Sequence, residues 1–254
     1  MPRPGGGRAA PSSVPTPLRR VVFGLGAAFV FLTLLGLGTW QVQRRAWKLD
    51  LIARTEARVH APAVPAPSPA AWAQVGPDDA YRHVTLSGRL LNDRETRVQA
   101  VTEYGAGFWV LTPLRREDGS LVLVNRGFVP GDRKDPASRP EGQVAGPVTV
   151  TGLLRLTEPG GAFLRANDPA ANRWYSRDVA AIAAARGLSD VAPYFVDADA
   201  APNPGGLPLG GLTVVSFPNS HLVYAVTWYG LALMLGGFFV YRRVMRRESP
   251  SFGE

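Results

Sequence analysis

The chain has 254 residues, of which 46% are hydrophobic and 19% charged, so it is not a disordered polyelectrolyte. It has no cysteine, which excludes a disulfide scaffold, zinc fingers and iron–sulfur sites. The net charge of +8 lies mostly in the ends, because residues 1–20 and 242–254 each carry four arginines with few acids. A nucleic-acid surface would place this excess on the folded body, so we expect no nucleic-acid partner.

Two charge-free runs of twenty residues lie near the ends of the chain, from Val21 to Trp40 and from Leu222 to Tyr241. At a rise of 1.5 Å per residue, each spans about 30 Å, the thickness of the hydrocarbon core of a bilayer. They predict two transmembrane helices. The first run is too long for a signal peptide and lacks a cleavage site, so it predicts an uncleaved anchor. Small residues in both runs favour packing of the two helices.

Two spans place both termini on one side of the membrane. The arginine-rich ends put that side in the cytoplasm, although five basic residues directly follow the first span. Residues 43–220 are then extracytoplasmic. We expect a bacterial inner membrane with a periplasmic loop. The acid-free N-terminus leaves a mitochondrial inner membrane as the alternative.

The first span is expected to continue as a helix beyond the bilayer, because Trp40, Arg44, Trp47 and Leu51 recur at helical spacing. Two roles are open for Arg44, Arg45 and Lys48: contact with lipid headgroups, or pairing with an anionic ligand at the outer membrane face.

The loop predicts a small β-rich α+β domain after a Pro/Ala-rich linker at residues 61–70, with a closed or part-closed barrel as one arrangement of its strands. An Asp178 cap and a Gly187 stop bound one helix. Strands are expected at residues 81–91, 96–101, 107–114, 120–129, 147–156, 193–196 and 212–217. The predicted organisation is a tail (1–20), a span (21–42), a helical extension with the linker (43–79), the domain (80–217), a second span with its entry (218–241) and a tail (242–254).

The domain carries no recognisable catalytic motif. His60 is expected to be solvated and His83 to be a hydrogen-bonded structural residue. The Asn125-Arg126-Gly127 sequence reads as a turn at the end of a strand, where Gly127 permits an unusual φ or a close backbone approach. Four aspartates are expected to be solvated loop carboxylates: Asp78, Asp79, Asp197 and Asp199.

His221 stands at the outer mouth of the second span, where helical spacing gives it a face in common with Tyr224, Trp228 and Ala232. Imidazole is a common axial ligand of haem iron, so this face suits a planar macrocycle. An interfacial histidine beside interfacial aromatics is the competing interpretation.

Three blocks of this sequence, in this order along the chain, form a recognisable set of motifs. They are Trp40-Gln41, Arg44, Trp47-Lys48 and Leu51-Ile52; Thr112-Pro113-Leu114 with Val122 to Pro130; and Pro218-Asn219-Ser220-His221-Leu222, Tyr224-Ala225 and Thr227-Trp228-Tyr229. These blocks resemble the Surfeit locus protein 1 family, whose members assist the assembly of haem-copper cytochrome oxidases. Val223 and Phe128 depart from the family pattern, where many members carry Gln and Trp.

The resemblance implies a non-enzymatic assembly factor that binds haem a as cargo and acts on subunit I of cytochrome c oxidase. His221 matches the proposed haem ligand and would be the axial ligand of the iron, beside Tyr224 and Trp228. Arg44 and Arg45 are candidate partners of the haem propionates. The machinery of haem a synthesis is a further candidate partner.

Three alternatives stay open. They are a haem-independent scaffold for subunit I, an enzyme of haem a maturation, and an unrelated envelope sensor. The lack of paired histidines in the spans disfavours the enzyme, and the short tails disfavour the sensor.

Overall fold

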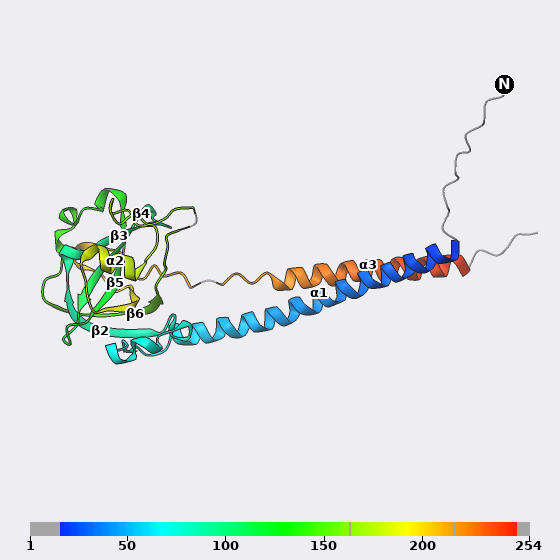
Figure 1. Ribbon diagram of the computed structural model, residues 1–254, viewed down its shortest axis with the longest axis horizontal. Coiled ribbons are helices and arrows are strands. Elements are labelled where there is room, and N and C mark those ends of the chain that lie inside the picture. Colours follow the sequence, from blue (N-terminus) through cyan, green and yellow to red (C-terminus); the bar gives the residue numbers. More distant parts are fainter. Residues whose placement is uncertain (1–15, 163, 216, 248–254) are drawn as a thin grey trace, which may run out of the picture. The chain divides into compact units, whose positions relative to one another are not determined.

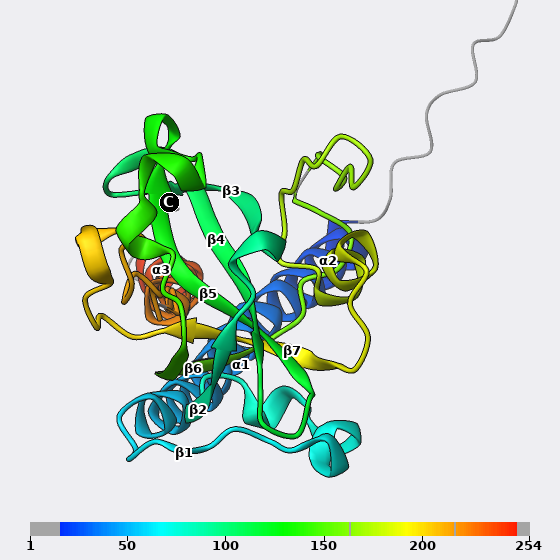
Figure 2. The same ribbon diagram turned by 90° about the vertical axis from the view of Figure 1, so that its left-hand side faces the viewer.

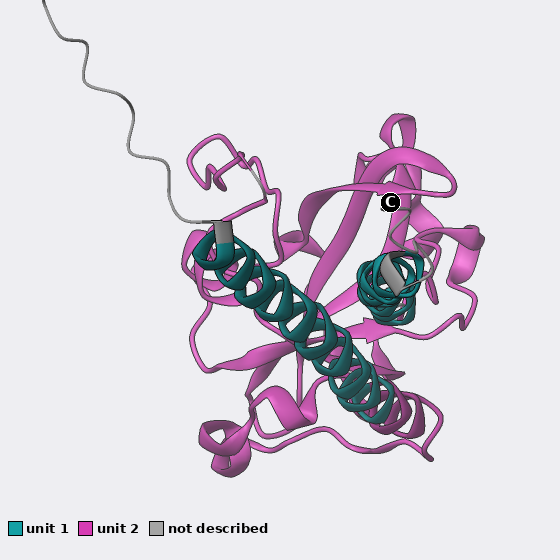
Figure 3. Ribbon diagram, turned by 90° about the vertical axis from the view of Figure 1, so that its right-hand side faces the viewer, with its two compact units in different colours: residues 1–51, 217–254 teal, residues 52–216 magenta. Residues whose placement is uncertain are grey.

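The computed structural model describes residues 16–162, 164–215 and 217–247, which form two compact units. One unit comprises Met1–Leu51 with Phe217–Glu254, and the other comprises Ile52–Ser216 (Figure 3). Each unit is described by itself.

The first unit contains α3 (His221–Arg247) and the greater part of α1 (Thr16–Val59), two long helices shown in Figure 1; the last eight residues of α1 belong to the second unit. Both are long and apolar enough to cross a membrane. The two predicted spans are therefore helical, and α1 continues beyond Trp40 for five further turns, as the spacing of its aromatic and basic residues predicted.

The second unit is built on a seven-stranded sheet in the order β1-β2-β6-β7-β5-β4-β3. An additional antiparallel pairing of β2 with β4 closes the five strands β2, β6, β7, β5 and β4 into a barrel, so the predicted barrel is confirmed (Figure 2). The strands are β1 (Val64–Pro65), β2 (His83–Leu90), β3 (Thr96–Thr102), β4 (Gly105–Arg115), β5 (Leu121–Pro130), β6 (Pro147–Leu156) and β7 (Val191–Ala198).

Two hydrophobic clusters lie on opposite faces of β5. Val122 and Val124 belong to the barrel interior, while Leu123 belongs to a cluster beneath α2 (Val179–Arg186) that also contains Trp174 and Phe195. Alternate side chains of a strand point to opposite faces, so a strand buried on both faces reads as a continuous apolar run. The run from Leu121 to Val124 has this pattern.

The local signals for the ends of elements are confirmed. The Asp178 carboxylate accepts a hydrogen bond from the Ala181 amide, and Gly187 ends α2 in the left-handed conformation with φ of 61°. In the hairpin turn between β4 and β5, the Asp118 carboxylate accepts hydrogen bonds from Ser120, which lower the pKa of Asp118.

Two segments differ from the prediction. The final strand expected at residues 212–217 is wrong, since the described residues of this range form no strand; Thr213 instead donates its hydroxyl to Asp197. The expected linker at residues 61–70 packs on the barrel, because β1 pairs in parallel with β2 and the Pro67 carbonyl accepts hydrogen bonds from the Tyr194 hydroxyl and the Arg116 guanidinium.

Candidate functional site

The two helices of the first unit approach closely along a line of small residues. Ala225 and Ala232, one heptad apart on α3, are 2% and 1% exposed. Gly38 of α1 lies against the Tyr229 ring, and the Tyr229 hydroxyl is 3.0 Å from Thr39 Oγ1. Small side chains allow this distance of approach, so the predicted packing of the two spans is confirmed.

This packing brings together two polar side chains that lie 180 residues apart. Gln41 of α1 is 9% exposed, and its Oε1 is 2.7 Å from Nδ1 of His221. An amide oxygen only accepts hydrogen bonds, so Nδ1 carries the imidazole proton and donates it. The lone pair of the neutral ring is then on Nε2. A metal-binding histidine is normally held in this manner by a partner on its other nitrogen.

The aromatic neighbours of His221 do not form one uniform face. Tyr224 is 52% exposed and Trp228 is half-buried, while Ala232 lies buried against α1. The buried Ala232 therefore does not provide the open space that its small side chain suggested, and of the predicted neighbours of His221 on this face only Tyr224 and Trp228 stay accessible. A helix in contact with another along one side cannot present that side to a ligand.

The basic residues of the first motif follow Gln41 directly on α1. Arg44 and Arg45 lie three and four residues further, about one helical turn along the axis. The Arg44 guanidinium stacks 4.0 Å above the Trp47 ring, which fixes its direction. Arg45 is half-buried.

Two further observations bear on this site. Among the described residues, no group of three or more His, Asp or Glu side chains is arranged to hold a metal ion. The amide oxygen of Asn219, two residues before His221, is buried and has no hydrogen-bond partner in the described part of the chain. His221 is the one histidine among the described residues of this unit.

Gln41 occurs in the sequence motif Trp40-Gln41, but the sequence assigns it no role. Its position at the end of a charge-free span is the one sign that its polar amide has a partner. The sequence does not identify this partner, because the register of α3 against α1 is not readable from either helix alone.

The Asn125-Arg126-Gly127 sequence lies inside β5, so its interpretation as a strand-end turn is wrong. The Arg126 guanidinium donates to the Gly142 carbonyl and to Asn203 Oδ1. Burial and the nearby charge of Arg139 lower the pKa of Arg126 to about 10. Gly127 has φ of +127°, and a Cβ there would overlap the Leu209 backbone, so the expected close approach is confirmed.

Asp197 is 2% exposed, which makes its expected solvation wrong. It accepts hydrogen bonds from Asn125, Arg155, Arg177 and Thr213. These partners come from β5, β6, the residue before the α2 cap and the segment after β7. They compensate the carboxylate, because an unpaired charge would be costly in the interior. Hydrogen bonds of Asn125, Arg126 and Asp197 therefore connect strands of the barrel and attach the segment 203–213 to it.

The SURF1 family profile matches residues 28–233, which include the barrel, most of α1 and the first half of α3. The chain belongs to the SURF1 family. Gln41, His221 and the whole of β5 lie within the matched residues.

Curated relatives agree with this membership in the SURF1 family. The chain is 39% identical to Surfeit locus protein 1 of Rattus norvegicus over 235 residues, covering 86% of this chain and 74% of the rat protein. It is 41% identical to Surfeit locus protein 1 of Homo sapiens over 218 residues, covering 79% and 71%. A SURF1-like protein of Monosiga brevicollis is 38% identical over 222 residues, covering 82% of each chain.

Proposed function

We propose that the protein is a membrane-bound assembly factor of haem-copper cytochrome c oxidase that binds haem a and assists its insertion into subunit I. It acts as a carrier and not as an enzyme. The observation that carries the proposal is the hydrogen bond from His221 Nδ1 to Gln41 Oε1, 2.7 Å long, because it leaves Nε2 free to bind iron.

The residues around His221 suit haem a as cargo. Tyr224 and Trp228 offer flat apolar surfaces beside the imidazole, and Arg44 and Arg45 offer guanidinium groups that match the geometry of a propionate. A carrier must also release its cargo. One axial histidine binds more weakly than a pair of axial ligands, so a single ligand favours transfer to subunit I.

The proposed compartment rests on the distribution of charge along the sequence. We place both helices across a bacterial inner membrane, with both termini in the cytoplasm and residues 43–220 in the periplasm; a mitochondrial inner membrane is the alternative. The machinery of haem a synthesis is the proposed source of the cargo, and the lipid bilayer is the permanent partner of α1 and α3.

The test is the absorption spectrum of detergent-purified protein from cells that make haem a. We expect the wild type to carry haem a and His221→Ala to lose it. Gln41→Leu removes the acceptor for Nδ1, so we expect affinity for haem a to fall by about 10- to 100-fold.

His60→Ala serves as the matched control, because Glu56, four residues earlier, is the one partner of the His60 side chain among the described residues. It should keep the wild-type spectrum. An unchanged spectrum in His221→Ala would exclude His221 as the ligand. A wild type without haem, from cells shown to contain it, would favour the haem-independent scaffold.

A further inference from the structure

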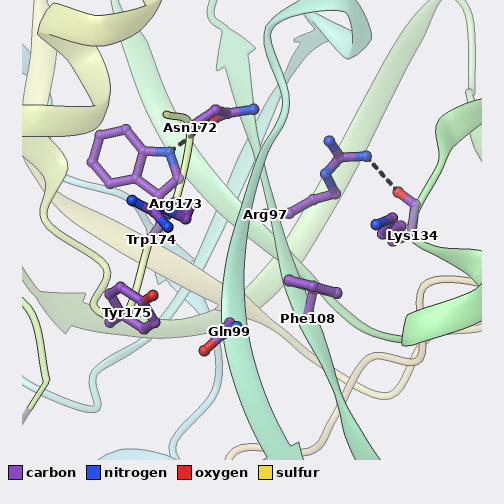
Figure 4. A pocket seen from close by; sticks show the side chains of 8 residues that line it. All are labelled: Arg97, Gln99, Phe108, Lys134, Asn172, Arg173, Trp174 and Tyr175. Atoms are coloured by element: carbon purple, nitrogen blue, oxygen red, sulfur yellow. Dashed lines mark hydrogen bonds between the residues drawn. The ribbon is translucent and has the colours of Figure 1, made fainter. Parts of the chain in front are cut away.

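A second pocket lies in the barrel unit, far in sequence from the helical site. It has a volume of about 210 Å³ and lies where β3, the start of β4 and residues 172–175 meet (Figure 4). No carboxylate lines it. Its lining residues are Arg97, Gln99, Phe108, Lys134, Asn172, Arg173, Trp174 and Tyr175.

Two cations that line this pocket, Arg97 and Lys134, have no carboxylate partner among the described residues, whereas Arg173 pairs with Asp168. Arg97 donates to the Lys134 main-chain carbonyl at 2.8 Å, which holds the guanidinium beside the lysine. Arg186 lines an adjacent pocket that shares Arg97 and Asn172, and it donates to Asn172 and to the Thr96 hydroxyl.

The nearby acids are already engaged elsewhere. Asp168 pairs with Arg173, and Glu95 pairs with the buried Arg139. Burial, followed by the neighbouring charge of Arg97, lowers the pKa of Arg186. The charge of Glu95 opposes this effect on Arg186. Arg97 and Lys134 have no carboxylate partner among the described residues, and a bound anion would compensate their charge.

The size and position of the pocket indicate the kind of anion. A volume of about 210 Å³ accommodates a carboxylate side chain and is below the ~300–1,000 Å³ usual for small-molecule sites. β3 is the last strand of the sheet. Its outer edge is bridged to Trp174 at Val98, where the Gln99 amide donates to the Trp174 carbonyl, and the rest of this edge pairs with no other strand among the described residues. Such an edge suits an extended peptide, and Phe108 and Tyr175 add aromatic surface.

We propose that this pocket binds an acidic side chain of an extended segment of a partner protein, with Arg97 and Lys134 holding the carboxylate. The Arg97 guanidinium and the Lys134 ammonium belong to residues that line the same pocket, and each can donate a charge-assisted hydrogen bond to a carboxylate oxygen. This docking site is independent of His221 and of haem.

The test uses the full-length protein in detergent and a fluorescein-labelled peptide of sequence Gly-Ser-Glu-Phe-Glu-Gly, read by fluorescence anisotropy. A peptide with Gln in place of Glu is the matched probe. We expect the Glu peptide to bind about tenfold more tightly, and its affinity to fall at high salt.

Arg97→Gln and Lys134→Gln should each lower affinity for the Glu peptide about tenfold. Lys134 is exposed and its side chain makes no hydrogen bond to a described residue, so Lys134→Gln should keep the fold. Arg89→Gln, an exposed arginine on β2 outside both pockets, is the control and should bind like the wild type.

Equal affinity for the two peptides, or wild-type binding by both pocket variants, would overturn the proposal. Displacement of the peptide by equimolar inorganic phosphate would overturn it in favour of a free oxyanion site. Because Arg97→Gln should leave the haem spectrum unchanged, failure of this proposal is distinguishable from failure of the haem proposal.

Discussion

His83 shows how one side chain joins distant parts of the barrel unit. Its Nδ1 is 2.9 Å from the Ala61 carbonyl and its Nε2 is 2.8 Å from the Asp199 carboxylate, so the predicted structural role is confirmed. Both partners accept hydrogen bonds, and only the protonated ring donates from both nitrogens. The hydrogen bond to Asp199 is the main cause that raises the pKa of His83 above 6.5.

A raised pKa in the folded state makes stability depend on pH. The contribution of His83 is fully present below pH 6.5 and is lost as the pH rises through the raised pKa. We expect the melting temperature of His83→Gln to fall less than that of the wild type as the pH rises through this range. The difference should be at most about 1 kcal/mol, because the Asp199 side chain is 40% exposed and screened by solvent. Parallel curves for the two proteins would contradict the assignment.

At the scale of the element, the pairing of α1 with α3 depends on one glycine among several. A Cβ at Gly38 would come within 2.8 Å of the Tyr229 ring, whereas Gly36, two residues earlier, has open space around it. The sequence offers both glycines as equal candidates for helix packing. The rotation of α1 about its own axis decides which of them faces α3, and that rotation also aims Gln41 at His221.

Gly38→Val should therefore force the helices apart and weaken the Gln41–His221 contact, one turn away. Overpacking of this kind costs about 1–3 kcal/mol, so we expect a lower melting temperature and reduced haem content in the purified protein. Gly36→Val carries the same loss of glycine and the same β-branched side chain. It should behave like the wild type, and equal damage from both variants would show that helix propensity and not packing is responsible.

At the scale of the whole molecule, the distribution of charge predicts the orientation in the membrane. Both ends carry clustered arginines, and the positive-inside rule predicts that they stay in the cytoplasm while the barrel unit is exported. Residues 1–15 and 248–254 lie outside the described residues, so only the sequence of these segments enters the prediction. The absence of cysteine makes the topology measurable with single introduced thiols.

We expect Ala137→Cys, in an exposed loop of the barrel unit, to react with a membrane-impermeant maleimide in intact spheroplasts. Ser12→Cys and Ser251→Cys should react only after the membrane is permeabilised. Labelling of either tail in sealed spheroplasts would reverse the predicted orientation or place the termini on opposite sides.

The sequence by itself determined the features that depend on neighbours along the chain. The charge-free runs defined α1 and α3, because each buries its backbone polar groups within itself. Alternation along residues 81–91 and the caps at Asp178 and Gly187 defined elements for the same local reason. The family motifs identified His221 and its basic neighbours, since a motif is read without knowing where it folds.

Only the tertiary structure decided the contacts between segments distant in sequence. The β2–β4 pairing closes the barrel, and Asp197 is buried because arginines from two other segments reach it. The Gln41–His221 hydrogen bond requires the exact rotation of two helices about their axes. Local periodicity predicts which face of a helix or strand is buried, but not which face of another element packs against it. The partner of a buried polar side chain is therefore known only from the folded structure.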